Sequence, residues 1–148
     1  MPKVLVMLGS KSDKTFGDEC LEQLGAFGVE GKMEISSAHR KPAQTAALAS
    51  QAESQGFEVI IAMAGLSAAL PGVVAAHSNL PVIGVPLPAA LGGVDALLAT
   101  VQMPPGIPVA TVTIGSAGAK NAAVLAARIL ALKYPAVKEA LARHRESL

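Results

Sequence analysis

The chain has 148 residues, of which 51% are hydrophobic, 16% charged and 3% aromatic, and its formal net charge is +1. This length corresponds to one domain, which we expect to span residues 1–148. A nearly neutral chain without a long basic run excludes the usual charge pattern of proteins that bind nucleic acid or an anionic membrane. The single Cys20 excludes an internal disulfide, which suits a reducing compartment. The apolar run at the N-terminus, up to Leu8, is too short for a signal peptide, so we expect a cytoplasmic location.

Apolar runs of strand length alternate with helical patterns along the whole chain. The predicted strands cover residues 3–8, 32–35, 59–62, 81–86 and 108–114. The predicted helices cover residues 16–27, 42–54, 67–77, 94–101 and 119–132, and residues 134–148 form a charged C-terminal helix. This alternation predicts an α/β fold, a flavodoxin-like three-layer αβα sandwich around a five-stranded parallel sheet with a C-terminal helical tail.

The excess of apolar residues also bears on membranes and on assembly. Residues 59–76 approach the length of a membrane span, but Gly65, Ser67, Pro71 and Gly72 interrupt them, so we interpret them as a buried strand and helix and expect no membrane contact. The scarcity of charge favours burial of apolar faces against other copies. We therefore expect a homo-oligomer in which residues 134–148 pack on a neighbouring subunit.

Polar residues follow the first predicted strand in the turn Gly9-Ser10-Lys11-Ser12-Asp13. Hydroxyls and free backbone amides at a helix start bind phosphate well, although Asp13 could serve only as a helix N-cap. The turn lacks the P-loop pattern, so it does not indicate a nucleoside triphosphate.

A second polar turn, residues 36–42, follows the second predicted strand and contains Ser37, Ala38, His39 and Arg40. Histidine changes its charge near neutral pH, and arginine can donate two hydrogen bonds to a phosphate or carboxylate. Because the carboxyl ends of parallel strands share one edge of the sheet, both turns should border one site. A His-Arg pair there suits proton transfer on a phosphorylated substrate.

The third turn, Gly65-Leu66-Ser67-Ala68-Ala69, partly matches the nucleophile elbow of serine hydrolases. Its final glycine is absent, and a triad would need Asp95 and the tail residue His144, so a hydrolase is only a rival hypothesis. The glycine-rich start at Gly115-Ser116-Ala117-Gly118 is better explained by close helix packing than by phosphate binding. The scattered histidines show no metal-ligand spacing, so we predict no metal.

Several segments resemble the PurE family, the carboxyl-transfer enzymes of de novo purine biosynthesis, over nearly the whole chain. They are Gly9-Ser10-Lys11-Ser12-Asp13, Ser37-Ala38-His39-Arg40-Lys41-Pro42 and residues 80–86, 101–104, 108–111 and 121–123. The resemblance implies a homo-octamer that acts on an aminoimidazole ribonucleotide without a cofactor. Class I members move the carboxyl group of N5-carboxyaminoimidazole ribonucleotide (N5-CAIR) to ring carbon 4, forming CAIR, and class II members carboxylate aminoimidazole ribonucleotide (AIR) with CO2.

The resemblance also implies roles for individual residues. His39 is the expected general acid and base, and the ribonucleotide is expected to contact residues of all three turns: Gly9, Ser10, Ser12, Asp13, Ser37, Ala38, Arg40, Gly65, Ser67 and Leu70. One departure concerns the third turn, because Ala69 stands where class I members usually carry a second histidine. Ser67 is similar to class II and Arg40 to class I. We predict the class I mutase, with the direct carboxylase and a non-catalytic ribonucleotide-binding module as alternatives.

Overall fold

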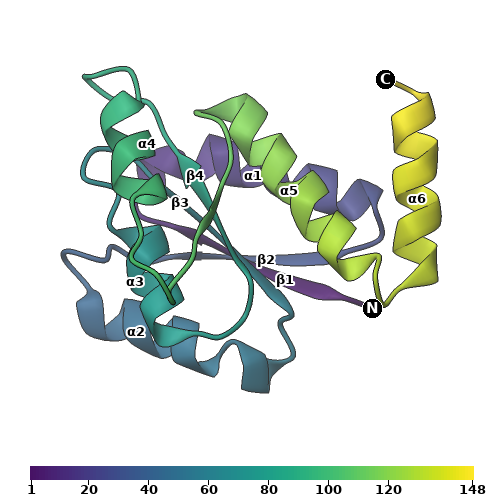
Figure 1. The fold of residues 1–148 in the computed structure, drawn as a ribbon, viewed down its shortest axis with the longest axis horizontal. Coiled ribbons are helices and arrows are strands. Elements are labelled where there is room, and N and C mark those ends of the chain that lie inside the picture. The colour runs from purple at the N-terminus through teal and green to yellow at the C-terminus, as the bar shows by residue number, and fades with distance from the viewer.

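A computed structural model describes all residues, 1–148, as one parallel five-stranded sheet with the strand order β2-β1-β3-β4-β5 (Figure 1). The strands are β1 Lys3–Leu8, β2 Glu30–Ile35, β3 Val59–Ala64, β4 Val82–Pro86 and β5 Ala110–Thr111. The helices are α1 Lys14–Ala26, α2 Pro42–Gln51, α3 Leu70–His77, α4 Val94–Val101, α5 Ser116–Leu130 and α6 Pro135–Glu146. The predicted flavodoxin-like fold class is confirmed.

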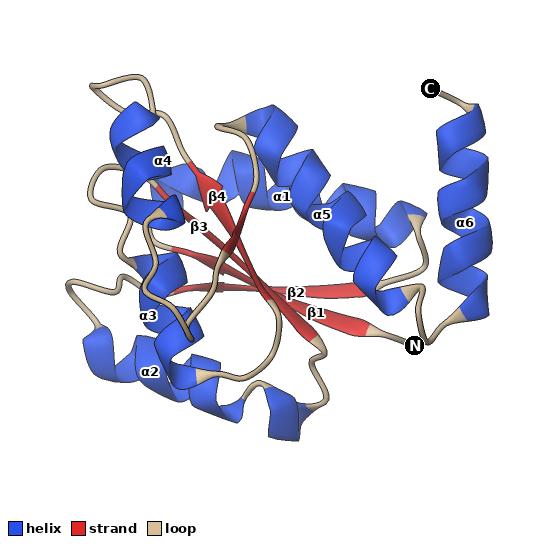
Figure 2. Cartoon of the chain, viewed as in Figure 1, coloured by secondary structure: helices blue, strands red, loops and turns tan.

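Two apolar cores flank the sheet, because the central strands present hydrophobic side chains on both faces. In β1, Val4, Val6 and Leu8 belong to the core shared with α1 and α5. Leu5 and Met7 belong to the opposite core, which α2, α3 and α4 cover. Figure 2 shows the resulting three layers, with the sheet between the two groups of helices.

The strand order places a topological switch point between β1 and β3. The chain runs from β1 outward to β2 and then returns to β3 on the other side of β1. The turns after β1 and β3 are therefore neighbours, and the Gly9 amide donates to the Met63 carbonyl at 3.1 Å. Ligands of open parallel sheets bind at such a point, outside the carboxyl ends of the strands.

Several predicted boundaries are wrong. β3 continues to Ala64, past the predicted residue 62, and α5 spans Ser116–Leu130 where 119–132 was predicted. The helix predicted to begin at residue 67 begins at Leu70, because Leu66 and Ala68 adopt left-handed backbone conformations. β2 begins at Glu30, two residues before the predicted start. β5 is confined to Ala110–Thr111 within the predicted 108–114. Pro108 lacks the N–H that a ladder requires, which accounts for the later start of the strand.

The long apolar helix α5 is buried along one face only. Its buried residues include Ala119, Ala123 and Ala126, whereas Lys120 and Arg128 are exposed. A Cβ at Gly118 would collide with the Thr113 carbonyl group, which explains the glycine-rich helix start by close packing, as predicted. No helix in the chain has the combination of length and hydropathy needed to cross a bilayer.

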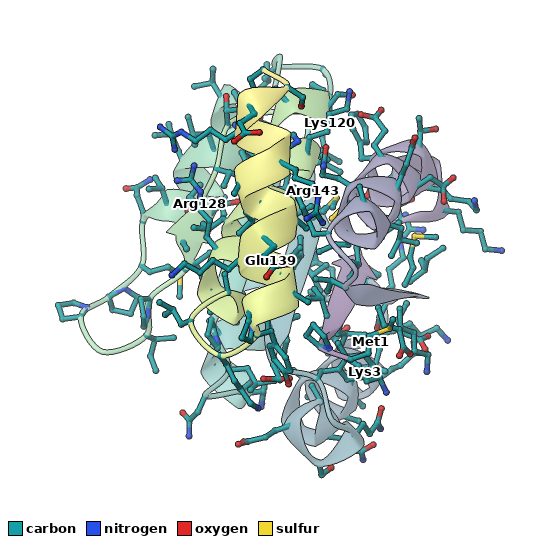
Figure 3. The ribbon with its side chains drawn as sticks, turned by 90° about the vertical axis from the view of Figure 1, so that its right-hand side faces the viewer. Met1, Lys3, Lys120, Arg128, Glu139 and Arg143 are labelled. Carbon is teal, nitrogen blue, oxygen red and sulfur yellow. The ribbon has the colours of Figure 1, made fainter.

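Helix α6 packs against its own subunit through Val137 and Ala140, which join the core beside α5. Figure 3 views this side of the molecule, with Glu139 and Arg143 on α6 and with Lys120 and Arg128 on α5 behind it. Leu148 lies past the last residue of α6 and is 91% exposed. Packing of residues 134–148 on a neighbouring subunit stays a prediction.

The start of α6 is held by one carboxylate. Tyr134 donates its hydroxyl hydrogen to Glu58, and the Lys133 ammonium lies 3.1 Å from the second carboxylate oxygen. Partial burial acts to raise the pKa of Glu58, but the hydrogen bonds from Tyr134 and Lys133 together lower it. These contacts join residues 75 and 76 positions apart in sequence.

Candidate active site

A cleft of about 770 Å³ lies at the carboxyl edge of the sheet, between the turns that follow β1, β2 and β3. All eleven residues predicted for the site line it: Gly9, Ser10, Ser12, Asp13, Ser37, Ala38, His39, Arg40, Gly65, Ser67 and Leu70. Sequence positions up to 61 residues apart are thus brought together, because parallel strands end at a common edge.

The first turn is preorganised around two serine hydroxyls. Ser10 caps a short 3-10 helix over Lys11–Asp13, where its hydroxyl accepts a hydrogen bond from the Ser12 amide at 3.3 Å. The two hydroxyl oxygens are 3.0 Å apart. Burial raises the pKa of the neighbouring Asp13, against an opposing hydrogen bond from the Ser10 backbone. Asp13 occupies the N-cap position of α1, but its side chain makes no capping hydrogen bond there.

The second turn presents two side chains that can carry positive charge. The Ser37 hydroxyl accepts a hydrogen bond from the Arg40 amide at 3.0 Å, and the Ser37 carbonyl accepts one from the Lys41 amide at 2.8 Å. His39 and Arg40 are exposed, and neither side chain has a hydrogen-bond or ion-pair partner in the chain. Both are therefore free to contact a ligand in the cleft.

A pair of buried hydroxyls lies beneath this turn. Ser36, the residue after β2, is 2% exposed, and its oxygen lies 2.7 Å from the hydroxyl oxygen of the fully buried Thr45 in α2. The Thr45 oxygen also lies 3.0 Å from the Lys41 carbonyl oxygen, and the Ser36 oxygen lies 3.3 Å from the side-chain oxygen of Gln44. Each hydroxyl has one hydrogen, so one of the two donates within the pair and the other donates outward. The pair thus ties the strand to the first turn of α2 and fixes both ends of the segment that carries His39.

The third turn supplies small and apolar walls. Ala68 and Leu70 are 3% and 1% exposed, and the Ala68 amide donates to the Gly65 carbonyl at 2.9 Å. Leu66 and Ala68 have φ angles of 55° and 37°, a left-handed conformation that costs roughly 1–2 kcal/mol for a residue with a Cβ. Ala69 lines the cleft with a methyl group and has no titratable side chain.

The residues that line the cleft but were not selected in the sequence analysis include Lys11, Lys41, Gln44, Leu66, Pro88 and Ala89. Pro88 and Ala89 follow β4. Ligands bind outside the carboxyl ends of the strands, so including the turn after the fourth predicted strand would have identified these two residues. Lys11 and Lys41 form no ion pair within the chain. With Arg40 they make the cleft cationic, which suits an anionic ligand.

The structure does not support a serine hydrolase. His144 packs edge-on against Phe27, with the ring centroids 5.2 Å apart, and it does not line the cleft that contains Ser67. Asp95 does not line that cleft either. No cluster of three or more His, Cys, Asp or Glu side chains is arranged to hold a metal ion. Burial raises the pKa of Cys20 to about 12, so its thiol is not a nucleophile.

Comparison with known proteins decides the family. The family model described as AIR carboxylase matches residues 3–148. The chain belongs to the AIR carboxylase family.

Relatives within this family are similar over the full chain. A protein of Pyrococcus abyssi named N5-carboxyaminoimidazole ribonucleotide mutase is 53% identical over 149 residues, which cover 100% of this chain and 84% of the relative. A mutase of the same name from Saccharolobus solfataricus is 50% identical and covers 100% and 93%. The crystal structure of Treponema denticola PurE superimposes with a TM-score of 0.90 at 31% identity, covering 99% of this chain and 91% of the other. The predicted family is confirmed, and these names agree with the predicted mutase.

Proposed function

We propose that this member of the AIR carboxylase family is a class I PurE mutase of de novo purine biosynthesis, which converts N5-CAIR to CAIR. The observation that carries the proposal is the placement of His39. It is exposed, lacks a partner in the chain and lines a cleft that it shares with a serine-rich turn and a turn of small residues. The names of the relatives support the mutase over the direct carboxylase.

The ribonucleotide binds across the first two turns. Ser10 and Ser12 offer hydroxyls and a preorganised backbone, and Arg40 offers a guanidinium that can donate two hydrogen bonds to an anionic oxygen. The phosphate and the N5 carboxylate give the substrate at least two negative charges. The cationic side chains of Lys11, Arg40 and Lys41 in the cleft complement them.

His39 carries both proton transfers in this proposal. When the bond between N5 and the carboxyl carbon breaks, its electron pair stays on nitrogen, and protonated His39 delivers a proton there while CO2 forms. Carbon 4 then attacks CO2, and His39, now neutral, removes the ring proton from carbon 4 to restore aromaticity. The histidine thus returns to its starting protonation state, and no second titratable group is needed at Ala69.

The CO2 must stay in place between these two steps. It has no net charge and no hydrogen to donate, so it is retained by small apolar walls that exclude water. Gly65, Ala68 and Leu70 supply such walls on the third turn, beside the proton carrier.

We further propose that the functional unit is a cytoplasmic homo-octamer and that residues 134–148 contribute to its subunit contacts. Helix α4 supports assembly because Val94, Leu98 and Val101 recur on one face and are 55%, 49% and 50% exposed. Such a stripe is usually covered by another protein surface.

The test compares two substrate mixtures with the purified protein. We expect it to convert N5-CAIR to CAIR and to form little CAIR from AIR plus bicarbonate in the same time, followed by product absorbance. The opposite ranking would establish the direct carboxylase. Ribonucleotide binding without conversion of either mixture would establish a non-catalytic module.

A further inference from the structure

The residue Leu66 is unusual in both its backbone and its exposure. It and Ala68 are the two residues other than glycine with positive φ in the chain, and both belong to the third turn of the cleft. Glycine adopts this conformation without strain, so the backbone conformation does not explain why position 66 is a leucine. Its side chain is 61% exposed at the cleft, and contact with water does not stabilise an apolar side chain.

The rest of this turn is fixed, so Leu66 stands on a rigid base. Ala68 is buried, and its amide donates a hydrogen bond to the Gly65 carbonyl at 2.9 Å. Leu70 is the first residue of α3 and is 1% exposed. On the other flank, a Cβ at Gly65 would lie 3.3 Å from the Leu87 carbonyl oxygen, which shows how closely β4 supports the turn. Side-chain rotation at Leu66 therefore needs no movement of the walls around it.

We propose that Leu66 is the cap of the CO2 pocket and that it determines whether the released carboxyl group reaches carbon 4 or escapes. This inference rests on the proposed mutase function. With ribonucleotide in the cleft, the Leu66 side chain covers the space bounded by Gly65, Ala68 and Leu70. It takes no part in breaking the N5 bond or in forming the carbon 4 bond. Its effect is to keep CO2 from water while His39 changes its protonation state.

The test measures how much CO2 exchanges during turnover. N5-CAIR is converted in the presence of ¹³C-bicarbonate and carbonic anhydrase, and the labelled fraction of CAIR and the amount of AIR formed are read by mass spectrometry. Wild-type protein should give mostly unlabelled CAIR and little AIR. Leu66→Ala should raise both the labelled fraction and the AIR formed per turnover severalfold, because CO2 escapes before carbon 4 attacks it. Leu66→Met should behave as wild type, because it restores an apolar cap.

Two further variants control for other effects. Leu66→Gly also removes the cap but relieves the left-handed backbone, so it should leak like Leu66→Ala and unfold at a higher temperature than it. Leu132→Ala is the control for loss of an exposed leucine outside the cleft, because Leu132 is 90% exposed in the connection from α5 to α6. The labelled fraction of CAIR formed by this variant should match that of wild type. Particle size by light scattering shows whether each variant keeps its assembly.

Each outcome decides between explanations. Equal labelled fractions in wild type and Leu66→Ala, with turnover intact, would overturn the cap while leaving the mutase in place. A change in assembly without a rise in label would assign Leu66 to a subunit contact and overturn the cap as well. Full labelling of wild-type CAIR, or no conversion of N5-CAIR by wild type, would overturn the mutase itself and the cap with it.

Discussion

The buried hydroxyl pair beneath the His39 turn gives a sharp prediction about stability. Ser36→Ala removes the short contact of this hydroxyl to Thr45 and the longer one to Gln44, and it leaves the Thr45 hydroxyl with the Lys41 carbonyl as its acceptor at 3.0 Å. We therefore expect it to lower the free energy of unfolding by about 1 kcal/mol. Thr45→Val leaves the Ser36 hydroxyl with Gln44 alone, at 3.3 Å, inside the protein. We expect this variant to lose about 1–3 kcal/mol, because a poorly paired buried hydroxyl is expensive.

The double variant tests whether these losses have a common origin. Because both single changes remove the same 2.7 Å contact, the double variant should lose about 1 kcal/mol less than the sum of the two. For a chain of this size, 1 kcal/mol corresponds to roughly 2–4 °C in Tm. Ser50→Ala serves as the control, because Ser50 is exposed on the same helix and bonds only the Ala46 carbonyl.

The measurement is urea unfolding at fixed protein concentration, supported by thermal unfolding. Losses that add without coupling would refute the assignment of the pair. So would a Ser50→Ala variant that is destabilised as much as Ser36→Ala.

Two further predictions concern pH. Burial raises the pKa of Asp13 above its ordinary 3.8, so the folded protein loses stability as pH rises from 3.8 through the raised pKa of the folded state. Asp13→Asn should therefore have a higher Tm than wild type at about pH 7, and the two Tm values should converge at acid pH. The same variant should bind ribonucleotide more weakly in a titration. For Glu58, the effect of burial on the pKa is outweighed by the hydrogen bonds from Tyr134 and Lys133, so the pKa is lowered in the folded state. The charged carboxylate therefore stabilises the fold above pH 4.5, and this stability is lost as pH falls through the lowered pKa of the folded protein. Glu58→Gln should therefore speed amide exchange in α6 at neutral pH, and unchanged exchange would contradict the role of these contacts.

The sequence was informative wherever periodicity and chain order determine the structure. Apolar runs predict the five strands, and parallel strands with helices between them must end at one edge. The turns at residues 9–13, 36–42 and 64–67 could therefore be assigned to one site from chain order alone. His39 and Arg40 were found because their position after β2, and not their identity alone, placed them at that edge.

Other features carry no signal in the sequence. Leucine at position 66 gives no sign of a positive φ, since that angle arises from how the turn is fixed between β3, β4 and α3. The pair of Ser36 and Thr45 depends on how α2 packs on β2, and the bond from Tyr134 to Glu58 on where α6 begins. Leu148 follows the helical pattern but lies past the last residue of α6, where nothing in the subunit covers it.

The central claim is that His39 moves the proton in a cleft that binds the ribonucleotide through other residues. Its most direct test is His39→Asn, with turnover of N5-CAIR and AIR affinity measured on the same preparation. Turnover should fall by about 10²–10⁴-fold, while AIR affinity stays close to that of wild type, because Ser10, Asp13 and Arg40 are unchanged. A variant that keeps its turnover, or that loses ribonucleotide binding together with it, would contradict the account.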